Sequence, residues 1–327
     1  MKGRIHMLTR RHFTIGAATA CAVGAPAWAQ SYPTQDIRFV CGFAAGSGAD
    51  VIVRFFAEKM KPLAKRNIIV ENKVGAVGNI ATEYTARSKP DGHTVYVTGG
   101  SSLAAAHNMM KQPSIDVGKA LVPIGTINRQ PVMIAVRTDA PWKTFPEFVE
   151  AMKGKGNKAS YATANPAARV VGAMFTKLAG LQSVEVQYRT GADYLNDLAA
   201  GNVDFGIPDN VMAVAQEKAG RLRVLAVSTP DRLQAAPDYP TIRELGFDVS
   251  LSGWFAGFVP AATPQPIVSQ LNGWLNDVVK SPEGKAFLNT FASDPWVSSP
   301  EDAQALFLRE IKNWEDYVKL ANIEKQG

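Results

Sequence analysis

Residues 37–50, IRFVCGFAAGSGAD, decide the fold of this protein. They begin with an apolar, strand-like run at 37–41, continue through a loop of small residues, and reach a helix-period pattern at Asp50. A strand that leads into a helix through a short loop is the repeating unit of α/β proteins with parallel sheets. The stretch therefore predicts an α/β fold.

The same alternation continues along most of the chain. Further strands are predicted at 67–70, 94–98, 121–127, 132–136, 159–162, 184–188, 203–207 and 222–227. Helices are predicted between them, including 50–60, 168–178 and one that opens at the capping-box pattern Thr144-Phe145-Pro146-Glu147. This alternation predicts parallel sheets flanked by helices.

After Pro260 the pattern changes to three helices, predicted at 266–279, 283–291 and 301–321. The last one has an apolar stripe that predicts a core-facing side, formed by Ala305, Leu306, Ile311, Trp314, Val318 and Leu320. Nine strands suit two α/β lobes better than one sheet. We expect lobe 1 to comprise 30–128 and 253–327 and lobe 2 to comprise 129–252, with a ligand cleft between them.

The first 29 residues have the three-part pattern of an export signal. Basic residues precede a small-residue apolar stretch at 15–25, and Ala27-Trp28-Ala29 fits the cleavage pattern. The Arg10-Arg11 pair is similar to a twin-arginine signal, although paired arginines also occur in general secretory signals. Cys21 offers lipid attachment as an alternative, but the residues before it fit that poorly. We expect export to the periplasm.

Charge and composition exclude several classes of protein. The chain of 327 residues has a net charge of +6, and Lys2, Arg4, Arg10 and Arg11 of the signal account for four of these charges. The nearly balanced remainder disfavours nucleic-acid binding, and no long apolar run after the signal predicts a membrane span. We expect no nucleic-acid partner.

The mature chain offers little for catalysis or metal binding. Its only cysteine is Cys41, and its only histidines are His93 and His107. A Cys–His nucleophile pair is conceivable, but Cys41 ends an apolar run and is predicted to be a small buried side chain. Two histidines without clustered acids make a poor metal site. We expect no cofactor, no metal and no enzymatic activity.

Two strand-to-helix loops are the best candidates for a ligand site, one in each predicted lobe. Small residues let the backbone approach a ligand, and free N–H groups at a helix start favour an anion. The first loop is equally readable as a tight turn in which Asp50 caps its helix. In the second loop Asp193 disfavours an anion unless it caps its helix and points away from the ligand. The candidate residues are Phe43, Ala44, Ala45, Gly46, Ser47, Gly48, Ala49 and Asp50 in the first loop, and Tyr188, Thr190, Gly191, Ala192 and Asp193 in the second.

Several blocks of sequence together resemble the substrate-binding receptors of tripartite tricarboxylate transporters, the Bug receptors. The blocks are FAAGSGAD at 43–50, ENKVGAVGNI at 71–80, PDGHT at 90–94, PDYPTIRELGF at 237–247, Trp254, and Thr263-Pro264. The resemblance implies a periplasmic, two-lobed receptor that closes on a small carboxylate and presents it to a membrane permease. It also implies that backbone N–H groups and ordered water from the two loops hold one ligand carboxylate.

The chain departs from the family pattern in three places. Ala44-Ala45 replaces the usual Pro-Pro, Thr190 stands where glycine commonly follows the basic residue, and Arg169 stands where histidine is frequent. Arg169 is either a ligand residue or a solvated arginine on a helix face. Its planar donor fork suits a second carboxylate. We therefore expect a dicarboxylate, with an aromatic one such as terephthalate as the preferred guess.

Other candidate residues follow predicted strands. Ser101 and Ser102 are alternatively readable as a helix start, and Asp209 as a helix cap. The resemblance places distal pocket residues in the loop that contains Thr163 and Asn165. Trp142 and Trp254 are predicted to pack rather than to stack on a ligand. The expected function is a monomeric solute-binding protein for uptake. The alternatives are a ligand sensor for a membrane kinase and, less favoured, an exported carboxylate-processing enzyme.

Overall fold

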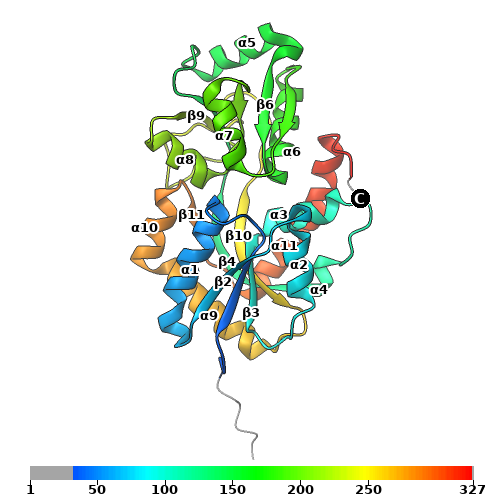
Figure 1. The fold of residues 1–327 in the computed structure, drawn as a ribbon, viewed down its shortest axis with the longest axis vertical. Helices are drawn as coiled ribbons and strands as arrows, with labels where there is room; N and C mark the ends of the chain where they lie inside the picture. The colour runs from blue at the N-terminus through cyan, green and yellow to red at the C-terminus, as the bar shows by residue number, and fades with distance from the viewer. Residues whose placement is uncertain (1–31, 326–327) are drawn as a thin grey trace, which may run out of the picture.

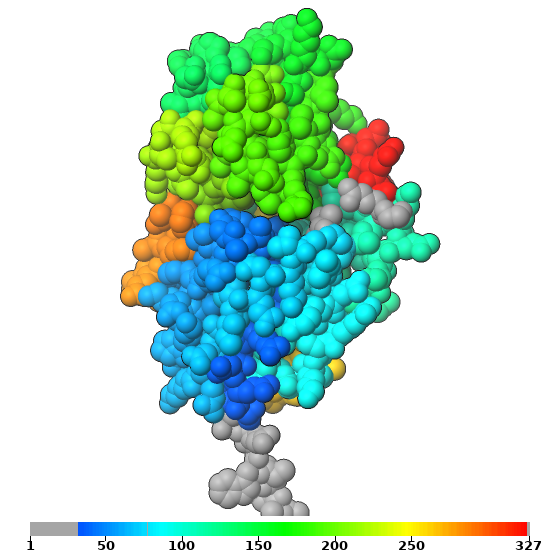
Figure 2. Space-filling view, viewed as in Figure 1, coloured from blue at the N-terminus to red at the C-terminus, as the bar shows by residue number. Residues whose placement is uncertain are grey.

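The computed structural model describes residues 32–325, apart from the side chain of Val77, and consists of two α/β lobes (Figure 1). The predicted export signal at 1–29 lies outside the described residues. Lobe 1 is built on a six-stranded sheet and lobe 2 on a five-stranded sheet. Figure 2 shows part of the blue N-terminal segment of lobe 1 directly against the green part of lobe 2.

The sheet of lobe 1 is mixed. Its order is β11 (Asp294–Pro295), β4 (Leu121–Gln130), β10 (Gly253–Pro260), β3 (Thr94–Gly99), β1 (Ile37–Cys41) and β2 (Ile68–Asn72). β1 pairs in parallel with β2 and β3, and Phe39 lies opposite Val70 and Val95. β10 is antiparallel to both β3 and β4, and β11 is antiparallel to β4.

The sheet of lobe 2 is also mixed. Its order is β7 (Val184–Gln187), β6 (Ser160–Thr163), β8 (Phe205–Gly206), β5 (Met133–Arg137) and β9 (Leu222–Val227). β6 is parallel to β7 and β8, whereas β5 is antiparallel to β8 and β9. The expectation of parallel sheets was therefore wrong in part, because β10 and β11 in lobe 1 and β5 in lobe 2 run against the remaining strands of their sheets.

β10 was missed from the sequence although it is the strand between β3 and β4. Nearly every residue of GWFAGFVP is buried, so the segment lacks the alternation that marks a half-exposed strand. Its glycines and final proline also disguise it as a loop. It carries the chain from lobe 2 back into lobe 1 (Figure 1).

Helices cover the faces of both sheets. In lobe 1 they are α1 (Gly48–Ala64), α2 (Asn79–Ala86), α3 (Gly100–Met109), α4 (Val117–Ala120), α9 (Gln265–Lys280), α10 (Pro282–Thr290) and α11 (Pro300–Leu320), with the 3-10 turn η1 (Ala76–Gly78). In lobe 2 they are α5 (Phe145–Lys155), α6 (Pro166–Leu178), α7 (Gly191–Ala200) and α8 (Asn210–Lys218), with the 3-10 turn η2 (Gly156–Lys158). Within the described chain, no helix combines the length and apolarity needed to cross a membrane.

Two local predictions about helices have clear outcomes. The capping box at Thr144 is confirmed, because the Thr144 hydroxyl accepts from the Glu147 N–H and the Glu147 carboxylate accepts from the Thr144 N–H. The stripe on α11 is only partly core-facing. Trp314 and Val318 are buried, but Ala305 and Leu320 are exposed, so the true buried side is shifted toward Ala303 and Phe307.

The hydrophobic core joins the lobes. One cluster of buried side chains includes Leu103 and Ala104 of α3 together with Val171 of α6. α3 and α11 of lobe 1 pack against α6 of lobe 2, and α1 of lobe 1 packs against α8 of lobe 2. These contacts bring the helix starts of the two lobes together.

Candidate functional site

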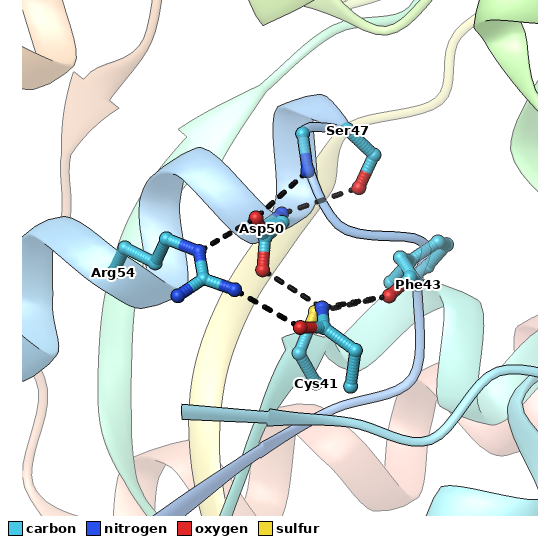
Figure 3. Close-up of polar contacts among 7 residues, drawn as sticks. Cys41, Phe43, Ser47, Asp50 and Arg54 are labelled. Atoms are coloured by element: carbon cyan, nitrogen blue, oxygen red, sulfur yellow. Dashed lines mark hydrogen bonds and ion pairs between the residues drawn. The ribbon is translucent and has the colours of Figure 1, made fainter. Parts of the chain in front are cut away.

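The first predicted loop is a tight, capped strand-to-helix connection (Figure 3). Ser47 is the N-cap of α1, and its hydroxyl accepts from the Asp50 N–H at 3.3 Å. The Ser47 N–H donates to the Ala44 carbonyl at 3.1 Å. Gly46 has a φ of +78°, a conformation that favours glycine.

Asp50 fastens this loop to the sheet (Figure 3). Its carboxylate accepts from the Gly46 N–H at 2.8 Å, from Arg54 Nε at 2.8 Å and from Asn72 Nδ2 at 2.8 Å. Asn72 Nδ2 also donates to the Phe43 carbonyl at 3.0 Å. Burial opposes ionisation of Asp50, but the bonds from Arg54, Asn72 and Gly46 outweigh it and lower the pKa of Asp50. The Asp50 side chain is thus turned into the loop, and the Gly46 N–H is already engaged.

The donors that remain for a ligand in this loop are at the start of α1. Gly48 and Ala49 are its first two residues, whose N–H groups have no partner within the helix. The positive end of the helix dipole adds to their preference for an anion.

The second predicted loop has the same construction. Thr190 is the N-cap of α7 and forms a capping box with Asp193, whose carboxylate accepts from the Thr190 N–H at 2.9 Å. Asp193 is therefore occupied by its own helix start. Gly191 and Ala192 open α7 and offer N–H groups, as Gly48 and Ala49 do on α1. The Tyr188 hydroxyl donates to Asp197 at 2.6 Å, which directs the ring along the helix.

Both loops pack on the first turn of α8. A β-carbon on Gly48 would lie 2.3 Å from Asp209 Oδ1 and 2.9 Å from Val211 Cβ. A β-carbon on Gly191 would lie 2.7 Å from the Met212 side chain. Asp209 is the N-cap of α8, and Val211 and Met212 belong to its first turn. The starts of α1, α7 and α8 therefore meet at the boundary between the lobes.

A third group of predicted residues lies at the end of β6 and the start of α6. Asn165 is the N-cap of α6, and its Oδ1 accepts from the Ala168 N–H at 2.8 Å. Thr163 is fully buried, and its carbonyl accepts from the Tyr188 N–H at 2.8 Å. Thr163 thus links this group to the second loop.

Arg169 is neither free nor fully solvated. Its Nε donates to Glu185 Oε1 at 3.2 Å, and its side chain is 17% exposed. The same Glu185 oxygen accepts from the Thr163 hydroxyl at 2.6 Å. Glu185 was missed from the sequence because it is one acid inside a short strand, and no local pattern signals that α6 brings Arg169 beside it.

Ser101, Ser102 and Trp254 surround the start of α3. The Ser101 hydroxyl donates to the Ser252 carbonyl at 3.4 Å, and Ser102 lies beside Gly99. A β-carbon on Gly100 would lie 2.2 Å from the ring of Trp254, which is 2% exposed. Trp254 is a packing residue, as predicted.

Cys41, His93 and His107 do not form a reactive or metal-binding group. Cys41 is fully buried, and burial raises the pKa of its thiol to about 11. Within residues 32–325, no group of three or more His, Cys, Asp or Glu side chains could hold a metal ion.

One open groove lies elsewhere, on the outer side of lobe 1. Its volume is about 1120 Å³, and Arg38, Ile69, Tyr84 and Met110 are among the residues that line it. None of the predicted ligand residues lines it. The groove is lined by charges of both signs, whereas the three helix starts supply directed N–H donors.

Replacing Gly46 tests the strain in the first loop. A β-carbon there meets no atom within 4 Å, so the cost of Gly46→Ala comes from its φ of +78° alone. We expect a loss of about 1–2 kcal/mol in the free energy of unfolding, measured with urea. The control is Gly154→Ala in α5, which also has open space but no positive φ and should be neutral or stabilising. Equal effects of the two changes would mean that the loop is not strained.

Comparison with known proteins identifies the family of this chain. The model of the family described as tripartite tricarboxylate transporter family receptor matches this chain over residues 52–323. The protein BugT of Bordetella pertussis is 27% identical over 321 residues, which cover 95% of this chain and 97% of BugT. A relative from Bordetella bronchiseptica is 29% identical over 312 residues, which cover 94% of this chain and 92% of the relative.

Solved structures share this fold over most of the chain. The periplasmic binding protein BugD superposes with a TM-score of 0.82 at 29% identity, over 90% of this chain and 100% of BugD. An R. palustris protein solved with adipate has a TM-score of 0.83 at 26% identity, over 90% of this chain and 99% of that protein. MatC of Rhodopseudomonas palustris, solved with malate, has a TM-score of 0.78 at 25% identity, over 88% of this chain and 100% of MatC. The chain therefore belongs to the receptor family of the tripartite tricarboxylate transporters, and it is a periplasmic solute-binding protein rather than an enzyme.

Proposed function

We propose that this receptor captures a small dicarboxylate between its two lobes and delivers it to the membrane permease of a tripartite tricarboxylate transporter. One observation carries the proposal: α1 of lobe 1 and α7 of lobe 2 begin with glycines that pack on the same turn of α8. A carboxylate at this point receives N–H donors and helix dipoles from both lobes. Its binding therefore favours the closed arrangement.

The second carboxylate of the ligand binds Arg169 in this proposal. The bond to Glu185 uses Nε only, so the two terminal nitrogens of the guanidinium keep a planar fork for a carboxylate. The relatives solved with adipate and with malate hold ligands that have two carboxylates, which supports this ligand class. An aromatic dicarboxylate such as terephthalate is our preferred member of the class, because Ala44-Ala45 leaves the first loop without the bulk of proline rings.

A thermal-shift screen tests the ligand class, with terephthalate, adipate, malate and benzoate in the panel. We expect the dicarboxylates to raise the melting temperature and benzoate to do so only weakly. Small-angle scattering then tests closure: the radius of gyration should fall when the best ligand saturates the protein. A panel without any stabilising dicarboxylate would contradict the proposed function.

Arg169→Ala tests where the second carboxylate binds. A charge-assisted hydrogen bond contributes about 1.5–3 kcal/mol, so the change should weaken the best dicarboxylate by at least about tenfold in calorimetry. Benzoate affinity should hardly change, because that ligand has no second carboxylate.

The matched control is Arg221→Ala, which removes the same charge from an exposed position in lobe 2 and should affect neither ligand. Equal losses for the dicarboxylate and for benzoate would mean that Arg169 supports the fold or the first carboxylate.

We also propose that residues 1–29 direct the protein to the twin-arginine pathway and that the mature protein is a monomer. Mass spectrometry of the exported protein should find Gln30 at its N-terminus, and replacing Arg10 and Arg11 by lysine should block export.

A further inference from the structure

Asp209 is an acid placed at the boundary between the lobes. It is the N-cap of α8, and its Oδ1 accepts from the Met212 N–H at 2.9 Å. Part of the residue remains accessible to water, although protein atoms surround its carboxyl group. The residue was predicted as a ligand residue or a cap, and the cap is present.

Asp209 lies against the start of α1 and near Tyr194 of α7. Its Oδ1 lies against Gly48 of α1, where a β-carbon would come within 2.3 Å. From α7 it faces Tyr194, which is 1% exposed and whose hydroxyl has no hydrogen-bond partner among the described residues. Burial, and then the charge of Asp209, raise the pKa of Tyr194 well above its ordinary value.

No cation faces Asp209 from the elements packed around it, so far as the described residues show. α7 presents Tyr194, and the residue paired with Asp209 beside β5 is Val132. α1 contributes Gly48, which carries no charge. The nearby acid of α1, Asp50, is paired with Arg54. Burial therefore raises the pKa of Asp209, against the Met212 and Val211 N–H groups, which favour the charged form.

We infer that Asp209 takes up a proton when the ligand carboxylate binds at the starts of α1 and α7. This inference rests on the proposed function, because it needs a ligand carboxylate beside Gly48 and Gly191. Two carboxylates that share a poorly solvated site cannot both stay ionised at low cost, so one of them holds a proton. The proton comes from solvent, and the neutral Asp209 then has an O–H to donate.

The sign of the pH dependence follows from this coupling. Between the pKa of Asp209 in the free receptor and its higher pKa in the complex, each ligand that binds brings about one proton with it. Over that range the affinity should fall about tenfold for each unit rise in pH. Below the pKa of the free receptor the proton is already present, and the affinity should be independent of pH.

Calorimetry with terephthalate, adipate and malate tests the inference. Titrations at pH 7 to 8 in phosphate and in Tris, whose ionisation enthalpies differ, give the number of protons taken up per ligand. The ligands are fully ionised at these pH values, so they contribute no proton change. For the full mature receptor we expect an uptake that approaches one proton as the pH rises.

Asp209→Asn assigns the proton to this residue. Asparagine keeps an oxygen that accepts from the Met212 N–H, so the cap of α8 is retained. We expect the variant to bind with no proton uptake and no pH dependence. The control, Asp248→Asn, removes an exposed acid of lobe 2 and should leave the proton count unchanged.

The possible outcomes separate this inference from the function on which it rests. Binding of a dicarboxylate without proton uptake by the unmodified receptor would overturn the role of Asp209 and leave the proposed function standing. Proton uptake that persists in Asp209→Asn would assign the proton to another group and would also overturn the role of Asp209. Failure of every dicarboxylate to bind would overturn the proposed function itself, and this inference with it.

Discussion

Gly48→Ala is expected to weaken ligand binding by up to about a hundredfold. The new β-carbon would lie 2.3 Å from Asp209 Oδ1 and 2.9 Å from Val211 Cβ, both in lobe 2. Overpacking of this kind costs about 1–3 kcal/mol, and 1.4 kcal/mol corresponds to a factor of ten in affinity. Because the clash lies between the lobes, it is relieved when they separate. The substitution therefore destabilises the closed arrangement more than the open one.

The measurement for Gly48→Ala combines calorimetry with small-angle scattering. The variant should bind weakly and should fail to compact at ligand concentrations that saturate the parent, while its melting temperature changes little. Gly273→Ala in α9 is the control, because its β-carbon meets no atom within 4 Å. A variant that binds and compacts like the parent would mean that Gly48 and Asp209 separate during ligand capture.

Asp50→Ala is expected to lower the free energy of unfolding by about 3 kcal/mol. The carboxylate is buried and accepts from the Gly46 N–H, Arg54 and Asn72, and its removal leaves these donors without an acceptor. We count little for the ionic part of the Arg54 contact, because that arginine is 51% exposed. Ligand affinity should fall as well, since the first loop loses its attachment to β2.

Lowering the pH should also reveal how much Asp50 stabilises the folded protein. The pKa of Asp50 is lowered in the folded protein, so its contribution to stability is present above the ordinary pKa of an aspartate and is lost as the pH falls through the folded value. Urea unfolding of Asp50→Asn should therefore show a weaker loss of stability toward low pH than the parent.

The control for Asp50→Ala is Glu315→Ala, which breaks an exposed pair with Lys319 and should lower the free energy of unfolding by less than about 1 kcal/mol. If Asp50→Ala costs no more than this control, Asp50 does not hold the loop.

Local patterns predicted most of the fold well. The strands at 37–41 and 222–227 have the predicted bounds, and the capping box at Thr144 is present. These features depend on residues close together in the chain, where periodicity and capping chemistry act. β10 was missed because a strand buried on all sides has no period of its own, and its antiparallel pairing depends on the route between lobes.

The site divides in the same way. The sequence by itself determined the two strand-to-helix loops, because small residues and capping side chains set a helix start within a few positions. Only the tertiary structure decided that Gly48 meets Asp209, that Gly191 meets Met212, and that Glu185 pairs with Arg169. The physical reason is distance along the chain: Gly48 and Asp209 lie in different lobes and are joined by the packing of α1 on α8, which no local preference encodes.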